Sequence, residues 1–135
     1  MRVASEDPFP HSVNLKDGSR VLIRRAEPED FQMLFLMFNS LSADTMFGRF
    51  LRSQMRLAKG EVQEMLGLED ENVTSLIAVV EKNHEKQAIG EARYVTDSAG
   101  RLAEAAVVVA DEWQNRGLGT ALFSDLIAEA RRRGL

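Results

Sequence analysis

The sequence predicts a single domain of the α/β (α+β) class, in which helices flank a central sheet. Three observations indicate this class. A short apolar run is followed by aromatic residues at helical spacing, beginning at Phe31. Three β-rich segments separated by turn signals come next. The last segment, from Gly117, carries leucines four residues apart, as an amphipathic helix does. With 135 residues, 44% of them hydrophobic, the chain suits one domain over residues 1–135.

The first half opens with a turn signal and a helix start. Asp17 and Gly18 favour a tight turn, and the β-rich run of Val21 to Ile23 comes directly after it. Pro28 suits the first turn of a helix, and the two acidic residues behind it complement the positive end of the helix dipole. The elements predicted for this half are a strand over 20–25 and helices over about 28–41, 42–54 and 58–67.

The second half reads as a three-stranded meander followed by one helix. The segment "LAEAAVVVAD" is apolar enough to be a central strand covered on both faces. Arginines fill the last turn of the final helix, where the dipole favours cations, and Gly134 is a suitable stop. The predicted elements are strands over 74–82, 87–97 and 102–111 and a helix over 117–134.

Composition excludes several classes of function. The formal net charge of −4 argues against a nucleic-acid-binding surface. The absence of cysteine excludes a disulfide framework, a thiol nucleophile and a thiolate metal site, and the two histidines are too far apart to suggest a metal centre. No apolar run approaches the ~20 residues that span a bilayer. We therefore expect a cytoplasmic protein with no metal and no membrane or nucleic-acid partner.

The stretch "WQNRGLGTAL" carries two glycines where a predicted strand leads into a helix. The free amides of a helix N-terminus bind anions, and glycines let a phosphate approach them closely. A Walker loop would need a lysine where Thr120 stands, and a dinucleotide fingerprint would need a third glycine where Leu122 stands. The pattern that fits is Gln/Arg-x-x-Gly-x-Gly/Ala, beginning at Gln114. The simpler interpretation is a strand-to-helix turn that needs a positive φ.

This motif, between "VVVADEW" and an amphipathic helix, resembles that of the GNAT N-acetyltransferase superfamily. The stretches "LKDGSRVLIRRAEPED" and "LSADTMFGRF" are similar to the start of the acetyltransferase domain of bacterial protein lysine acetyltransferases, so the resemblance covers about residues 9–135. It implies a mostly antiparallel central sheet with helices on both faces. It also implies binding of acetyl-CoA as co-substrate and transfer of the acetyl group to an amine, such as a protein lysine or a small-molecule amine.

The resemblance also assigns cofactor-binding residues. Loop amides would hold the pyrophosphate of coenzyme A, and the preceding strand would pair with the pantetheine arm through its backbone. The strand positions are Val107, Val108 and Val109. The loop motif begins at Gln114 and continues through Asn115, Arg116, Gly117, Leu118, Gly119 and Thr120.

Catalysis would need a base that takes a proton from the acceptor amine. Glu104, in the same strand and ten residues before Gln114, matches the place of the base in the lysine-acetylating branch. A carboxylate exposed on the strand is the alternative interpretation, and Glu91 is the second candidate base. A strand amide near Val109 would serve as the oxyanion donor. These roles imply direct attack in a ternary complex, without a covalent enzyme intermediate.

The chain departs from the family pattern at its end. Family members continue with further strands after the final helix, so we expect the C-terminal strands to be missing and the sheet edge to favour a homodimer. The only tyrosine, Tyr94, lies in the wrong element to protonate the leaving thiolate, so no general acid is assigned. Two other hypotheses stay open: a catalytically inactive CoA-binding regulatory module, and a binder of a different phosphate ligand.

Overall fold

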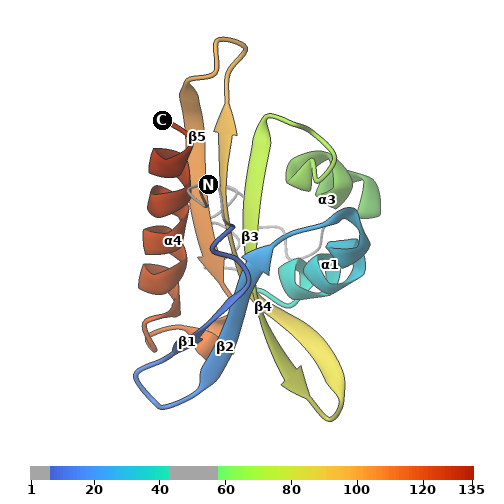
Figure 1. Cartoon of the computed structure of the whole chain (residues 1–135). Coiled ribbons are helices and arrows are strands. Elements are labelled where there is room, and N and C mark those ends of the chain that lie inside the picture. The colour runs from blue at the N-terminus through green and yellow to red at the C-terminus, as the bar shows by residue number, and fades with distance from the viewer. Residues whose placement is uncertain (1–6, 43–57) are drawn as a thin grey trace.

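In a computed structural model, the chain is described over residues 7–42 and 58–135. Its described strands form one five-stranded antiparallel sheet in the order β1-β2-β3-β4-β5. Helix α4 lies along one face of this sheet, and α1 and α3 lie along the other (Figure 1). The strands are β1 His11–Asn14, β2 Arg20–Arg25, β3 Val73–Lys82, β4 Glu85–Thr96 and β5 Leu102–Val109, and the helices are α1 Phe31–Asn39, α3 Lys59–Leu66 and α4 Leu118–Arg132, with 3-10 turns Pro28–Asp30 and Asp111–Trp113.

The predicted fold class is confirmed, and so are most of its elements. The strand over 20–25, the meander, and the helices near 28–41, 58–67 and 117–134 all form. The predicted helix over 42–54 lies mostly outside the described residues. Strand β1 was not predicted, because Val13 is its one strongly apolar residue and its conformation is fixed by pairing with β2.

The sheet separates two apolar layers. The layer on the α4 side packs Leu118, Leu122 and Leu126 against alternate residues of the strands, so the predicted leucine stripe is the buried face of α4. The opposite layer packs α1 and α3, with Leu34, Phe38 and Val62 among its fully buried residues. Residues i and i+2 of a strand share a face, so each strand divides its side chains between the two layers.

Gly90 lets α4 approach the sheet closely. A Cβ at this position would lie 2.8 Å from Leu122 Cδ1 and 3.3 Å from the Val108 carbonyl oxygen, closer than ordinary contacts. Gly90 pairs with Val109 at the end of β5. The first turn of α4 is therefore held against the strand end that leads into the glycine turn.

An ion cluster ties α4 to β2. The carboxylate of Glu129 is buried and accepts hydrogen bonds from Arg25 at 2.8 and 3.1 Å, and from Arg132 and Arg133 one turn further along α4. Burial acts to raise the pKa of Glu129, but the bonds from Arg25 and Arg132 outweigh it and hold the pKa below its usual value. Arg25 also binds Asp7, whose pKa the Arg25 bond helps to lower to about 2. The arginines at the end of α4 thus neutralise a buried carboxylate, beyond any effect on the helix dipole.

Candidate functional site

The site begins at the open edge of β5. Among the described strands β5 pairs only with β4, and the N–H of Ala110 donates to the carbonyl of Ile89 at 2.9 Å. Backbone groups of alternate residues in an antiparallel strand point to opposite sides. The N–H groups of Val107 and Val109 therefore face the open edge. These are positions at which the sequence predicts backbone pairing with an extended ligand.

The end of β5 is fixed by a side chain of the motif. Gln114 donates from Nε2 to the Val109 carbonyl at 3.0 Å, so its side chain closes the strand end onto the turn that follows. Nearby, Asp111 accepts a hydrogen bond from the Ser42 N–H at 3.2 Å, which links this turn to the end of α1. The sequence placed Gln114 in the cofactor loop but gave no sign that it would hold the strand.

The turn after β5 leads directly into the N-terminus of α4. Asn115 and Gly117 have φ angles of 65° and 94°, so the chain enters the left-handed region twice within three residues. No side chain caps the helix, and its first backbone bond runs from the Ala121 N–H to the Gly117 carbonyl at 3.1 Å. The amides of Leu118, Gly119 and Thr120 precede that bond and have no acceptor within the helix. With the helix dipole, they form an anion-binding end.

The two glycines of the motif differ in what the fold requires of them. Gly117 has a positive φ, which side-chain-bearing residues rarely adopt, so the backbone itself requires glycine there. Gly119 lies within α4 at a helical conformation, and a Cβ on it would meet only Val109 Cγ2, at an ordinary 3.7 Å. The fold therefore does not require glycine at residue 119. Because the Cβ of a helical residue is tilted toward the helix N-terminus, the missing side chain gives a ligand more room at the free amides.

Side chains of the loop have separate tasks. Leu118 is buried in the layer beneath α4, so only its backbone can face a ligand, while Asn115 and Thr120 are exposed. The guanidinium of Arg116 lies over the Trp113 ring at 4.8 Å and forms an ion pair with Asp17 at 2.8 Å. Leu118 thus anchors the loop in the core, Arg116 is fixed by its contacts, and Asn115 and Thr120 remain exposed.

The two candidate carboxylates lie on the sheet face opposite α4 but in different surroundings. Glu104 shares a face with Val108, which belongs to the α1 and α3 layer, and it is exposed because the first four residues of β5 are uncovered. The partly apolar setting expected for it from the sequence is absent in the described part of the chain. Glu91, paired directly with Val108, is fully buried and accepts a hydrogen bond from Ser75 Oγ at 2.7 Å. Of the two, Glu104 is the exposed carboxylate.

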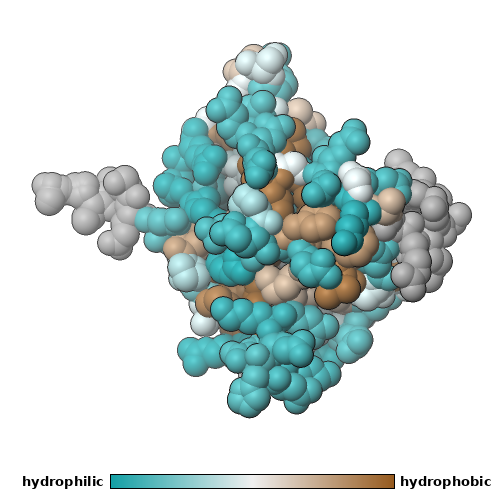
Figure 2. All heavy atoms as spheres, turned by 90° about the vertical axis from the view of Figure 1, so that its right-hand side faces the viewer, coloured by the Kyte–Doolittle hydropathy of each residue, from teal (hydrophilic) through white to brown (hydrophobic). Residues whose placement is uncertain are grey.

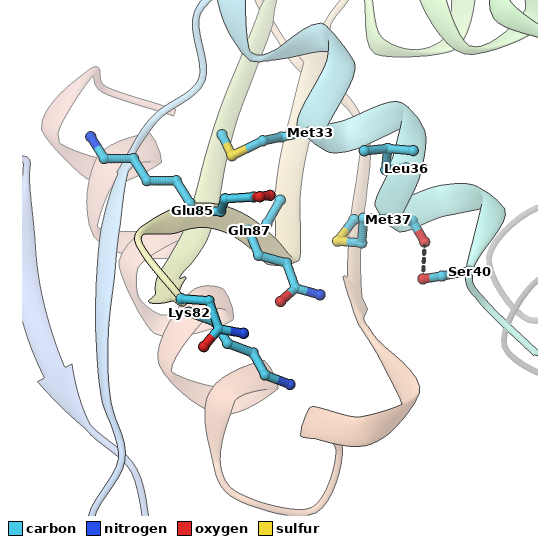
Figure 3. A pocket seen from close by; sticks show the side chains of 10 residues that line it. Met33, Leu36, Met37, Ser40, Lys82, Glu85 and Gln87 are labelled. Carbon is cyan, nitrogen blue, oxygen red and sulfur yellow. Dashed lines mark hydrogen bonds between the residues drawn. The ribbon is translucent and has the colours of Figure 1, made fainter.

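A separate cavity of about 370 Å³ lies between α1 and the β3–β4 hairpin, and the sequence did not indicate it. Figure 3 shows Met33, Leu36 and Met37 of α1 facing Lys82 and Gln87 of the hairpin. Seen from the α1 and α3 side, apolar atoms are exposed among hydrophilic ones (Figure 2). This cavity is built from α1 and the hairpin, and none of the glycine-turn residues lines it.

Other expectations concern groups away from the loop. Tyr94, to which the sequence analysis gave no catalytic role, is buried in the α4-side layer. Within residues 7–42 and 58–135, no three His, Asp or Glu side chains cluster in a way that could hold a metal ion. None of the helices in that part of the chain is long and apolar enough to cross a membrane.

An antiparallel sheet with helices on both faces, whose last described strand leads through a glycine turn into a helix N-terminus, defines the class: an α/β domain with a glycine-rich strand–turn–helix unit. The Acetyltransferase (GNAT) family matches residues 35–135. The chain belongs to the GNAT acetyltransferase family, as the sequence motif predicted.

Individual relatives agree with this assignment. The chain is 31% identical over 121 residues to an acetyltransferase of Pseudomonas aeruginosa, an alignment that covers 90% of this chain and 65% of the relative. The GNAT domain of PAT from S. lividans superposes with a TM-score of 0.79 and 25% identity, over 96% of this chain and 77% of that one. A GNAT acetyltransferase from Streptococcus pneumoniae matches with a TM-score of 0.64 and 27% identity, over 84% of this chain and 69% of that one. The chain thus spans about two thirds of the length of its curated relative.

Proposed function

We propose that this domain binds acetyl-CoA along the β5 edge and the glycine turn and transfers its acetyl group to a primary amine in a ternary complex. The observation that carries the proposal is the opening at Gly119. The fold makes no use of glycine at this position. A Cβ there would be tilted toward the helix N-terminus and would crowd a ligand at the free amides of α4. A ligand phosphate at these amides accounts for the glycine.

The strand preceding the turn supports the same ligand. The N–H groups of Val107 and Val109 face the open edge, where the amide groups of a pantetheine arm can pair with them as a strand would. In this proposal the Val109 N–H also donates to the acetyl carbonyl oxygen as negative charge develops on it. The binding contacts are mostly backbone groups, so the valine side chains are free to pack in the two layers.

The remaining step requires a proton acceptor. The amine nitrogen bonds to the acetyl carbonyl carbon, the carbon–sulfur bond breaks, and coenzyme A leaves with its sulfur. Glu104, the exposed carboxylate on the β5 face opposite α4, takes the proton that the amine gives up. Because Glu104 lies five residues from Val109, about 16 Å along the strand, the proton reaches it through water molecules rather than directly. Primary amines on protein lysines are the acceptor class that we favour, given the resemblance of the N-terminal stretch to lysine acetyltransferases.

Two measurements on the 135-residue chain test this proposal. Calorimetry should show binding of acetyl-CoA but not of ATP or NAD; binding of ATP alone would refute it. Release of free thiol from acetyl-CoA in the presence of a lysine peptide should then show turnover. Binding without turnover would favour the regulatory module instead.

Glu104→Gln tests the proposed base. We expect at least about a hundredfold loss of turnover, the lower range for removing a general base, with affinity for acetyl-CoA unchanged. Glu81→Gln is the matched control, because Glu81 is also exposed on the sheet, near the end of β3. Equal turnover in the two variants would remove Glu104 from the mechanism, and the rate of the Glu91→Gln variant would then decide the role of the second candidate.

A further inference from the structure

The turn between β1 and β2 lies against the glycine turn, although about 100 residues separate the two in the sequence. The N–H of Lys16 donates to the Arg116 carbonyl at 3.0 Å, and Asp17 binds the Arg116 guanidinium at 2.8 Å. Asp17 also accepts the Ser19 N–H at 2.9 Å, which shapes its own turn. Through these bonds the β1–β2 turn is fixed against the glycine turn.

The side chain of Lys16 extends over Gly117. Its Cγ and Cε each lie 3.6 Å from the place where a Cβ on Gly117 would be, and its Cδ lies 3.9 Å from it. Because Nζ is one bond of about 1.5 Å beyond Cε, it lies within about 5 Å of that point. The ammonium therefore lies beside Gly117, the N-cap residue of α4.

Among the charged side chains of the two turns, Lys16 is the one available to bind an anion. The guanidinium of Arg116 is neutralised by Asp17 and covered on one face by Trp113. Lys16 is exposed, and none of the residues that the structure describes accepts a hydrogen bond or forms an ion pair with its ammonium. A compact cation beside helix-terminal amides is suited to a phosphate oxygen.

We infer that Lys16, on the β1–β2 turn, binds a phosphate group of coenzyme A and so completes the phosphate site from outside the glycine motif. This inference rests on the proposed function, because it names a further binding residue of the same site. The pyrophosphate and the 3′-phosphate of coenzyme A offer the same chemistry to Lys16, and the experiment distinguishes them.

The test compares Lys16→Gln with wild type by calorimetry at low salt, using acetyl-CoA, its dephospho form, which lacks the 3′-phosphate, and acetyl-pantetheine, which lacks all phosphates. We expect Lys16→Gln to weaken acetyl-CoA binding about five- to tenfold and to leave acetyl-pantetheine binding unchanged. If Lys16→Gln also binds the dephospho form more weakly than wild type does, Lys16 contacts the pyrophosphate. If the two proteins bind the dephospho form equally well, Lys16 contacts the 3′-phosphate. Lys16→Arg should restore most of the affinity.

Lys59→Gln is the control for a change in net charge, since Lys59 is exposed on α3, across the sheet from this site. The inference is overturned if Lys16→Gln binds acetyl-CoA as tightly as Lys59→Gln does. It is also overturned if acetyl-pantetheine binding falls by the same factor, because the effect would then be structural. Failure of wild type to bind acetyl-CoA at all would instead refute the proposed function.

Discussion

Gly119→Ala separates what the fold needs from what the ligand needs. The substitution adds one methyl group at the second residue of α4, where φ is helical and the nearest atom, Val109 Cγ2, is at an ordinary 3.7 Å. Alanine loses less backbone entropy than glycine on entering a helix. We expect the variant to gain about 0.5 kcal/mol in the free energy of unfolding, which raises the melting temperature by about 2 °C.

The same methyl group should oppose ligand binding. A phosphate oxygen must come within about 2.9 Å of an amide nitrogen to accept a charge-assisted hydrogen bond, and a methyl group tilted toward the helix N-terminus narrows that approach. Loss of one such bond is worth about 1.5–3 kcal/mol, which raises the Kd for acetyl-CoA by about 10- to 150-fold. A variant that folds better and binds worse is expected only if the glycine serves a ligand.

Gly60→Ala provides the matched control. Gly60 is the second residue of α3, as Gly119 is of α4, and a Cβ on it would meet nothing within 4 Å. Thermal melting should show a comparable gain in stability for both variants, and calorimetry should show a change in Kd for Gly119→Ala alone. The reasoning is refuted if the two variants bind acetyl-CoA equally well, or if Gly119→Ala unfolds more readily than wild type.

Two further substitutions test the packing of α4. Glu129→Gln should destabilise the domain by about 3 kcal/mol at pH 7, the low end for breaking a buried ion pair, because Arg25 and Arg132 stay partly solvated. The folded pKa of Glu129 is lowered, so its contribution to stability is present above the unfolded pKa near 4.5 and is lost as the pH falls through the folded value. Urea unfolding should therefore show the difference in the free energy of unfolding between variant and wild type shrinking below about pH 4.5. A difference that does not depend on pH would contradict this. Gly90→Ala should cost about 1–3 kcal/mol by overpacking against Leu122, and in a double-mutant cycle Leu122→Ala should relieve part of that cost; strict additivity would show that the clash does not occur.

Local patterns in the sequence were sufficient for most of the fold. The run from Val21 to Ile23 predicted β2 with its observed bounds, and the leucine stripe from Leu118 predicted the buried face of α4. In both cases the signal is a spacing of apolar residues within one element. The short strand β1 lacks such a pattern, because its conformation is set by its partner.

The site was predictable only in part, because here too the sequence signals only what lies within one short segment. The glycine motif identified the loop, since its signal lies within six consecutive residues. The docking of Lys16 and Asp17 on Arg116 joins residues that no local pattern relates. The bonds of Glu129 to Arg132 and Arg133 could have been predicted from their spacings of three and four on one helix, but the contribution of Arg25 could not.

The contacts around the glycine turn also imply that cofactor binding and catalysis can be altered separately. Gln114 fixes the end of β5, Lys16 and Asp17 hold the carbonyl and side chain of Arg116, and Gly90 seats the first turn of α4 on the sheet. A loop held in this way is ordered before the ligand arrives, so less of the binding energy is spent on ordering it. Glu104 is exposed on β5, and within residues 7–42 and 58–135 it has no comparable hydrogen bond or ion pair. Changes at Lys16 or Gly119 should therefore act on Kd, whereas changes at Glu104 should act on turnover, and a variant of either group that moved both quantities together would contradict this division.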